Sequence, residues 1–201
     1  MSIMDKLHRR ERVVVLLSGG MDSAVCLAWA IDMGLHPSTL FFDYGQRHRD
    51  REWKAAKSVA LHFGILLVGR VELQIDGESS LTGQGPLVGS SVVVPGRNAA
   101  FLRAAAADGA ERIVMGCCRD DHATFEDCRP EFFAAMSAEL GIPIETPLLH
   151  IDKPGVVRLA QIHGGTFVLG KTWSCYAGGD EPCGKCGACE ARLRAFPAGW
   201  R

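Results

Sequence analysis

The sequence predicts an α/β protein with a doubly wound parallel sheet, and three observations support this. Short β-branched runs alternate with segments of good helix formers along most of the 201 residues. The first run, R-V-V-V-L-L at residues 12–17, shows no polar alternation, which is typical of a strand buried on both faces. A hydrophobic fraction of 47% is enough for one well-filled core, and no internal repeat indicates a solenoid or a propeller.

Five strands and five helices follow from this alternation. The predicted strands occupy residues 12–17, 39–43, 65–71, 113–116 and 143–146. The predicted helices occupy residues 24–33, 50–63, 97–108, 129–140 and 153–163. Ligands of doubly wound sheets bind at the carboxyl ends of the strands, so the loops that follow the strands form the candidate site.

Glycine and proline mark the helix boundaries in chain order. Gly34 and Gly64 end the first two helices, because glycine readily adopts the left-handed conformation found at helix C-termini. Residues 95–96, Pro-Gly, lead into the third helix, whose alanine-rich face suits close packing. Pro130 and Pro154 lie in the first turns of the last two helices, where the missing N–H costs no helical hydrogen bond.

Two segments depart from the regular alternation. Residues 74–91 are rich in Gly, Ser, Thr and Pro, and a loop of this length inside a compact domain is usually a lid or disordered. We therefore expect a mobile lid there. Residues 1–172 are expected to form one α/β nucleotide-binding domain, and residues 173–201, rich in cysteine, a small module packed on it.

Charge and hydropathy exclude several classes of protein. Lys and Arg number 22 against 23 Asp and Glu, a net charge of -1, which excludes broad electrostatic binding of nucleic acid as the main activity. No run of about 18 apolar residues exists, and residues 1–10 are polar and basic without the apolar region of a secretory signal. We therefore expect a cytoplasmic protein that does not associate with membranes.

A candidate phosphate loop, S-G-G-M-D-S at residues 18–23, follows the first strand. There the backbone N–H groups and a helix N-terminus converge, which favours an anion. The glycines allow close approach, the serines add hydroxyl donors, and Asp22 can hold a metal ion or cap the helix. A plain strand-to-helix turn is the alternative, and the position after the strand favours the anion site. The lysine of a Walker loop is absent, which disfavours phosphoryl transfer of the P-loop kind.

Four of the eight cysteines form a compact pattern, C-x7-C-x2-C-x2-C, at Cys175, Cys183, Cys186 and Cys189. A reducing compartment does not favour disulfides. Thiolates two residues apart lie close together, so we expect one structural zinc ion with four sulfur ligands. Two disulfides and an iron–sulfur cluster are the alternatives, and zinc is favoured because nothing else in the sequence indicates electron transfer.

The other four cysteines are scattered: Cys26, Cys117, Cys118 and Cys128. Cys128 precedes a predicted helix, whose dipole would favour the thiolate, and catalysis is a hypothesis for this residue. A buried packing role is the more common fate of a single cysteine. Packing is also the expectation for the other three.

The S-G-G-x-D-S string resembles the PP-loop of the ATP pyrophosphatases, and further strings resemble one member of that group, the 7-cyano-7-deazaguanine synthase (QueC) family. They are L-S-G-G-M-D-S at 17–23, F-D-Y-G-Q-R-H at 42–48, V-P-G-R-N at 94–98, E-D-C-R-P-E-F at 126–132, E-T-P-L-L-H-I-D-K at 145–153, T-W-S-C-Y at 172–176 and C-G-K-C-G-A-C at 183–189. Each string is short, but their order and spacing are specific. The resemblance runs from Val13 to about Phe196.

The resemblance implies an ATP-dependent carbon–nitrogen ligase that converts 7-carboxy-7-deazaguanine and ammonia to the nitrile 7-cyano-7-deazaguanine (preQ0), on the way to queuosine. The carboxylate would be adenylated and attacked by ammonia, and the oxygen of the resulting amide would be adenylated again and expelled. The resemblance also implies ATP and Mg²⁺ at the site, one structural Zn²⁺ and a homodimer. The expected partners are small molecules, with no direct contact to nucleic acid.

Carried over to this sequence, the resemblance implies a role for each of several residues. The nucleotide phosphates would be held by Ser18, Gly19, Gly20, Asp22, Ser23 and Arg97. The catalytic candidates are Asp22, Arg97, His48 and Asp127, and the substrate contacts are Tyr44, Gln46, Asp121 and Arg129. Arg97 opens a helix and suits the charge of a phosphate transition state. For each loop residue, a solvated surface side chain is the alternative.

Three departures from the family pattern keep other functions open. His48 and Glu52 are one residue further apart than in the family, residues 74–91 form a shorter loop, and the sequence stops at Arg201. A QueC-like paralogue that transfers an activated deazapurine to a macromolecular acceptor, such as a protein, is the first alternative. A non-catalytic nucleotide-binding zinc protein is the second, and it is disfavoured by the intact phosphate loop and Arg97. Direct modification of tRNA is the third, and the near-zero charge disfavours it.

Overall fold

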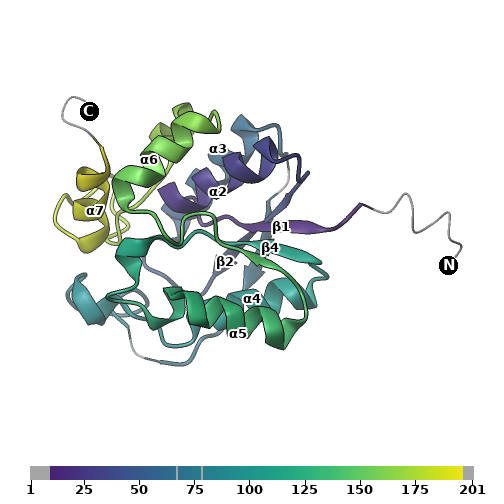
Figure 1. Ribbon diagram of the computed structural model, residues 1–201. Helices are drawn as coiled ribbons and strands as arrows, with labels where there is room; N and C mark the ends of the chain where they lie inside the picture. The colour runs from purple at the N-terminus through teal and green to yellow at the C-terminus, as the bar shows by residue number, and fades with distance from the viewer. Residues whose placement is uncertain (1–9, 67, 78, 197–201) are drawn as a thin grey trace, which may run out of the picture.

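The computed structural model describes residues 10–66, 68–77 and 79–196. All strands are parallel and form one sheet in the order β3-β2-β1-β4-β5, which confirms the predicted doubly wound fold (Figure 1). They are β1 (Val13–Leu16), β2 (Ser38–Asp43), β3 (Gly69–Glu72), β4 (Arg112–Val114) and β5 (Ile144–Glu145). The strand order reverses between β1 and β4, and ligands bind at such a reversal.

Helices cover both faces of the sheet. The α-helices are α2 (Met21–Asp32), α3 (Arg49–His62), α4 (Arg97–Ala107), α5 (Pro130–Leu140), α6 (Lys153–Ile162) and α7 (Gly187–Ala195). The short 3₁₀ helices are η1 (Gly89–Val92), η2 (Arg119–Asp121), η3 (Glu126–Cys128) and η4 (Phe167–Lys171). Figure 1 shows α2, α3 and α6 on one side of the sheet and α4 and α5 on the other. No helix between residues 10 and 196 is long and apolar enough to cross a membrane.

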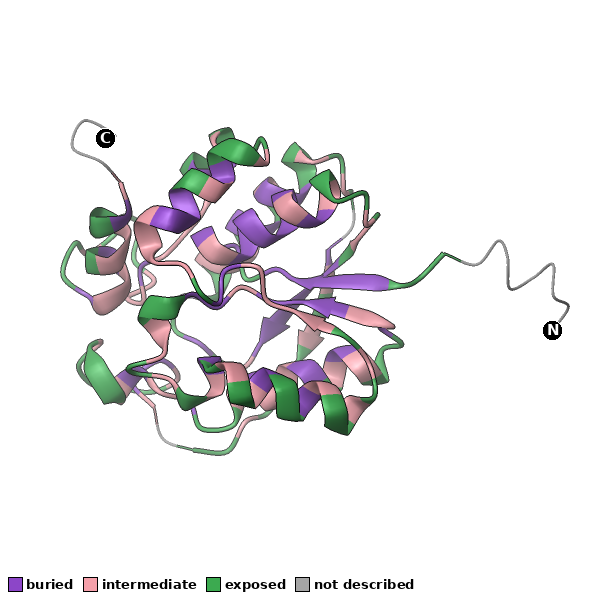
Figure 2. Cartoon of the chain, viewed as in Figure 1, coloured by how far each residue is buried: buried purple, intermediate pink, exposed green. Residues whose placement is uncertain are grey.

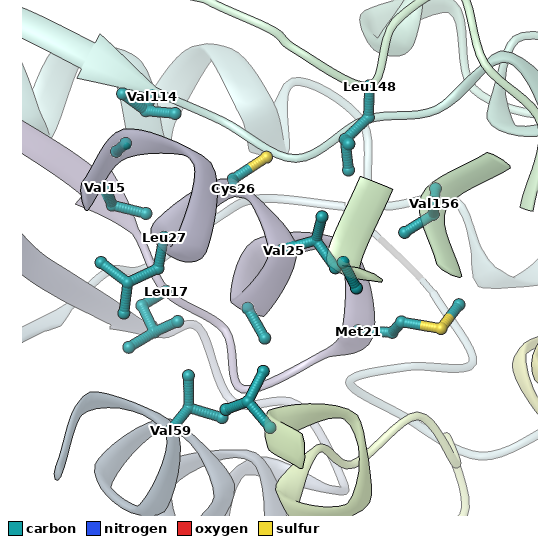
Figure 3. Packing of buried hydrophobic residues seen from close by; sticks show 14 of the residues in the cluster. Val15, Leu17, Met21, Val25, Cys26, Leu27, Val59, Val114, Leu148 and Val156 are labelled. Carbon is teal, nitrogen blue, oxygen red and sulfur yellow. The ribbon is translucent and has the colours of Figure 1, made fainter. Parts of the chain in front are cut away.

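Strand β1 lies at the centre of the core and is buried on both faces, as predicted. Val13 and Val15 belong to the apolar cluster formed with α2, α3 and α6, which Figure 3 shows from close by. Val14 and Leu16 belong to the second cluster, formed with α4 and α5. Figure 2 shows that burial is concentrated in the strands and on the helix sides that face them.

Some element boundaries differ from the predictions. Helix α2 begins at Met21 rather than at residue 24, because the candidate phosphate loop runs directly into the first helical turn. Strand β3 begins at Gly69 rather than at residue 65, because the Ile65 N–H closes the end of α3 by donating to Ala60 O at 2.9 Å. No helix is predicted for the cysteine-rich tail, yet α7 forms there.

The described parts of the segment for which we expect a lid, residues 74–77 and 79–91, are anchored to the body of the protein. Leu81 is 1% exposed and lies in a small apolar cluster of its own. The carbonyl of Leu81 accepts the N–H of Arg47 at 2.8 Å, and the carbonyl of Leu87 accepts the N–H of Gly187 at 3.2 Å. The segment therefore bridges the loop after β2 and the cysteine module, and its movement as a lid stays a prediction.

The described part of the cysteine module, residues 173–196, packs on the carboxyl edge of the sheet. The Trp173 N–H donates to Gly19 O at 2.9 Å, and Arg51 of α3 forms an ion pair with Asp180. Helix α7 lies beside α6 (Figure 1). Residues 1–9 and 197–201, which the predicted division includes at its two ends, lie outside the described residues.

Gly19→Ala is expected to destabilise the protein more than Gly34→Ala. Both glycines have a positive φ, 82° and 73°, so both alanines carry left-handed strain of roughly 1–2 kcal/mol. At position 19 the new Cβ would also come within 2.6 Å of Ala56 N and closer still to Glu52 O, whereas position 34 has open space. Such overpacking adds about 1–3 kcal/mol. Urea unfolding measures the difference, and equal losses in the two variants would contradict it.

Candidate active site

A cavity of about 400 Å³ opens at the carboxyl ends of β1, β2 and β4, where the topology favours a ligand. Its walls come from the candidate phosphate loop, from the loops after β2 and β4, from α4 and α6, and from the cysteine module. The predicted site residues that line it are Ser18, Gly20, Asp22, Ser23, Tyr44, Gln46, His48, Arg97 and Asp121. Gly19, Asp127 and Arg129 are not lining residues. The individual roles of all twelve stay predictions.

The candidate phosphate loop leaves the backbone donors of α2 open. Gly20 is the N-cap of the helix and brings no side chain to the first-turn N–H groups. Ser18 Oγ accepts the Gly20 N–H at 3.2 Å, and Ser23 Oγ donates to Gly20 O at 3.0 Å. The two hydroxyl groups lie 3.1 Å apart and shape the turn. An open helix N-terminus of this kind attracts phosphate oxygens.

Lys153 adds a cation that the sequence analysis does not assign. Its Nζ lies 2.5 Å from Asp22 Oδ2, so an ion pair whose side chains are 11% and 16% exposed joins the first turns of α2 and α6. Burial lowers the pKa of Lys153, but Asp22, Asp121 and Cys118 outweigh it and hold the pKa above its usual value. The sequence feature that could have identified Lys153 is its position. A lysine that opens the helix after the last strand lies at the same sheet edge as the candidate phosphate loop.

Asp22 keeps one carboxylate oxygen without a partner. Burial raises the pKa of Asp22, while Lys153 opposes this effect. Its Oδ1 is buried and accepts no hydrogen bond from the described residues, whereas Oδ2 contacts Lys153. Ligand atoms of Asp22, Cys118 and Asp121 lie within 4.8 Å of one another. Burial is the main cause that raises the pKa of Cys118 to about 12, and the negative charge of Asp22 adds to this effect. An orphaned oxygen beside a second carboxylate fits a divalent cation.

A hydrogen-bonded group follows β2. Gln46 is 2% exposed, its Oε1 accepts the Tyr44 N–H at 2.9 Å, and its Nε2 donates to Phe42 O at 3.0 Å and to Glu52 Oε2 at 3.1 Å. His48 Nε2 lies 3.3 Å from Glu52 Oε1. His48 is the N-cap of α3, and Glu52 follows four positions later in its first turn, where the two side chains meet. The amide oxygen and the amide nitrogen of Gln46 both form hydrogen bonds within the protein, so this side chain stabilises the loop.

Arg97 is a partly buried cation held by aromatic rings. Its Nη1 donates to Tyr44 Oη at 3.5 Å, and its guanidinium carbon lies 5.8 Å from the Tyr44 ring centre and 5.9 Å from that of Phe101. Burial lowers the pKa of Arg97, but Tyr44 and Asp127 raise it above its usual value. Within the part of the chain that the structure describes, Arg97 forms no ion pair. Its charge is therefore available to an anion in the cavity.

Asp127 supports the start of α4. Its Oδ2 accepts the Asn98 N–H at 3.3 Å, and its carbonyl accepts Asn98 Nδ2 at 2.9 Å. Asn98 is 1% exposed and is another residue that the sequence analysis does not assign, although it ends the V-P-G-R-N string beside Arg97. Arg129 is half exposed, and its Nε donates to His122 O at 3.1 Å. Asp127 thus positions the helix turn that carries Arg97, while Arg129 lies outside the cavity wall.

The four cysteines expected to bind a metal come together. Their ligand atoms lie within 4.8 Å of one another, at Cys175, Cys183, Cys186 and Cys189. Backbone N–H groups of Ala177 and Cys183 donate to Cys175 Sγ at 3.4 and 3.3 Å. A backbone N–H of Lys185 is the main cause that lowers the pKa of Cys183 to about 6, which favours the thiolate. The cluster fits one metal centre with four sulfur ligands.

Helix α7 of the cysteine module forms part of the cavity wall. Glu190, Arg192 and Arg194 line the cavity, and the sequence analysis assigns none of them. Arg192 Nη1 donates to Thr172 Oγ1 and Nη2 to Leu169 O, both at 2.7 Å, and burial lowers the pKa of Arg192. Cys186 is the N-cap of α7 and Cys189 lies in its first turn, so the four-cysteine cluster is joined directly to this wall.

The remaining cysteines are buried free thiols. Cys26 lies in the core, as Figure 3 shows and as its predicted packing role requires. Cys128 Sγ donates to Cys117 Sγ at 3.4 Å, and both thiols line the cavity, so the catalytic hypothesis for Cys128 stays open. Cys118, for which only packing is expected, lies beside Asp22.

The matching family profile and the similar proteins of known sequence indicate the same family. The profile of the family described as "Queuosine biosynthesis protein QueC" matches residues 12–199. The 7-cyano-7-deazaguanine synthase of Synechococcus elongatus is 42% identical, over 92% of this chain and 90% of the relative. The synthase of Acidobacterium capsulatum is 39% identical over 94% and 93%, and that of Thermoplasma acidophilum is 36% identical over 93% and 88%.

Solved structures agree on the fold. A 4-thiouridine synthetase in complex with RNA and ATP has a TM-score of 0.52 at 18% identity, covering 92% of this chain and 49% of that chain. The U34-tRNA thiolase NcsA from Methanococcus maripaludis, with its [4Fe-4S] cluster, has a TM-score of 0.51 at 16% identity, covering 95% and 66%. At these identities the likeness concerns the fold alone.

Lys153→Met is expected to lower the free energy of unfolding by about 3–5 kcal/mol, because it leaves the carboxylate of Asp22, which is only 16% exposed, without its cation. Arg103→Met is the matched control, since the ion pair of Arg103 with Glu139 lies on the surface, where such pairs contribute little. Denaturant unfolding at neutral pH compares the two variants. A loss for Lys153→Met no larger than that for Arg103→Met would show that the ion pair of Lys153 with Asp22 is not important for stability.

Cys186→Ala is expected to abolish stoichiometric metal binding and to lower stability and solubility, because three thiolates no longer complete the site. Cys26→Ala, which alters a buried cysteine outside the cluster, should keep the metal. Elemental analysis of the purified variants measures metal per chain and identifies zinc or iron. Normal metal content in Cys186→Ala would refute the four-cysteine centre.

Proposed function

Because the chain belongs to the queuosine biosynthesis protein QueC family, we propose that it is a carbon–nitrogen ligase that makes 7-cyano-7-deazaguanine from 7-carboxy-7-deazaguanine, ammonia and ATP. One observation carries this most directly: a single cavity offers an anion site and a cation, and the transfer of AMP from ATP needs both. The open N-terminus of α2 and Arg97, which forms no ion pair with the described residues, meet that need.

The proposed reaction uses the cavity twice. A substrate carboxylate oxygen attacks the α-phosphorus of ATP, pyrophosphate leaves, and ammonia then displaces AMP to form the amide. The amide oxygen is adenylated by a second ATP, and loss of AMP and the remaining nitrogen proton forms the nitrile. The backbone N–H groups of α2 bind the leaving pyrophosphate, and Arg97 neutralises charge as the phosphorus–oxygen bonds change. Lys153 holds Asp22 in place and adds positive charge at the same edge.

Two metal ions belong to the proposal. Asp22, whose Oδ1 is orphaned, and Asp121 would hold Mg²⁺, which when bound neutralises phosphate charge. The four cysteines would hold Zn²⁺ in a closed tetrahedral site, whose role is to position α7. Iron is the competing metal for the second site, and elemental analysis separates the two.

The substrate is proposed to be a small molecule and the protein a homodimer. The net charge of -1 supports a small substrate rather than a polyanion such as tRNA. Similarity to synthases over 92% to 94% of the chain favours the nitrile product over transfer to a macromolecular acceptor. The homodimer rests on the family resemblance, and light scattering on the purified protein measures it.

The decisive experiment incubates the purified protein with ATP, Mg²⁺ and 7-carboxy-7-deazaguanine, with and without ammonium, and follows the products by mass. The proposal predicts the nitrile only with ammonium, together with AMP and pyrophosphate. ATP cleavage with adenylate but no nitrile would instead favour the acceptor-modifying alternative. No cleavage of nucleotide and no consumption of substrate would refute an enzymatic role.

Arg97→Met is expected to lower turnover by about 10²–10³, because removing one preorganised charge from a phosphate transition state costs on this order. Arg103→Met, two turns away on the exposed side of α4, is the control and should keep its activity. Steady-state rates and circular dichroism are measured on both variants. Full activity in a folded Arg97→Met protein would remove Arg97 from the mechanism.

A further inference from the structure

A second group of metal-ligand side chains lies beside the phosphate loop, away from the four-cysteine cluster. It brings together Asp22 from the first turn of α2 and Cys118 and Asp121 from the segment after β4. One ligand atom from each lies within 4.8 Å of the other two, and Cys118 is completely buried. Ligands of a single ion lie at such separations, because each is about 2.0–2.6 Å from the metal.

An independent observation indicates that this group is incomplete without a ligand. Asp22 Oδ1 is buried and has no hydrogen-bond partner within the described residues, and a buried charged acceptor without a partner is costly. Lys153 does not meet this need, because its Nζ contacts the other oxygen, Oδ2. A cation bound at Oδ1 would give this oxygen the partner that it lacks and would neutralise charge on the carboxylate.

The local charge favours a divalent ion. Asp22, Asp120 and Asp121 bring three carboxylates to this corner of the cavity, and Lys153 brings one positive charge against them. Asp120 Oδ2 accepts the Lys153 N–H at 3.1 Å, and Asp121 Oδ2 accepts the Cys118 N–H at 3.0 Å. These backbone contacts hold both loops, so the ligand positions are set before an ion arrives.

The donor set differs from that of an ordinary magnesium site. Two carboxylates suit any hard divalent ion, but Cys118 adds a sulfur, and soft ligands select metals such as Zn²⁺, Co²⁺ and Cd²⁺. We propose that Asp22, Cys118 and Asp121 form a divalent-cation site that binds thiophilic metal ions in preference to Mg²⁺. On binding, the S–H bond of Cys118 breaks, the proton passes to solvent, and a metal–sulfur bond forms.

This inference deepens the proposed function, because the site lies where that function needs the Mg²⁺ of ATP. A thiophilic ion held there occupies Asp22, so the enzyme is open to inhibition by such ions. Binding is measurable without ATP or deazapurine, so a failure of the metal site and a failure of the ligase proposal are distinguishable.

The test uses protein that carries one Zn²⁺ per chain, in the four-cysteine cluster, with excess zinc removed by dialysis, and titrates it with Co²⁺ alone. Zn²⁺ generally binds N, O and S sites more tightly than Co²⁺, so the four-cysteine cluster stays filled, and zinc retention is checked by elemental analysis. We expect one additional Co²⁺ per chain with a sulfur-to-cobalt charge-transfer band that excess Mg²⁺ does not remove. Cys117→Ser, a change in the neighbouring cysteine outside the group, should keep the band, whereas Cys118→Ser should lose it.

Asp121→Asn gives a second measurement, since this residue is partly exposed and its replacement does not open the core. We expect Co²⁺ affinity to fall by at least roughly 10–100-fold, because loss of a ligand costs no less than loss of a group that supports one. Absence of the band in wild-type protein, or its persistence in folded Cys118→Ser, overturns the proposal. If Cys118→Ser does not fold, unchanged Co²⁺ affinity in Asp121→Asn overturns it.

Discussion

Gly19 is the point where three parts of the molecule meet, and its lack of a side chain allows them to meet. Its backbone packs closely against α3 next to Glu52 and Ala56, and its carbonyl accepts the N–H of Trp173. The phosphate loop, the helix that carries Glu52 and the cysteine module are therefore held at one position. A Cβ would push α3 away from the loop and open the cavity that these parts enclose.

The cations of the cavity differ in what surrounds them, and this difference suggests a division of work. Lys153 contacts the Asp22 carboxylate, so much of its charge is used inside the protein. Arg97 lies against the rings of Tyr44 and Phe101, which hold a guanidinium without cancelling its charge. The first arrangement stabilises the phosphate loop, and the second leaves a positive field for a ligand. A net charge of -1 is compatible with both, because the positive charge is local.

The cysteine cluster affects the cavity without facing it. None of its four cysteines lines the cavity, but Cys186 is the N-cap of α7, and α7 forms part of the cavity wall. The same module contacts the phosphate loop through Trp173 and the segment 74–91 through Gly187. The position of this cluster therefore affects the shape of the cavity, although its cysteines do not line it.

The sequence by itself determined the alternating fold, the candidate phosphate loop and the four-cysteine cluster, because each depends on residues close together in the chain. Hydrophobic period, a helix N-terminus and C-x2-C spacing are local properties. Only the tertiary structure decided that Lys153 meets Asp22 across 131 positions, that Asp127 holds Asn98, and that Gln46 turns its amide inward. These contacts depend on how helices from different parts of the chain pack on one sheet, and no local pattern specifies the direction in which such side chains point.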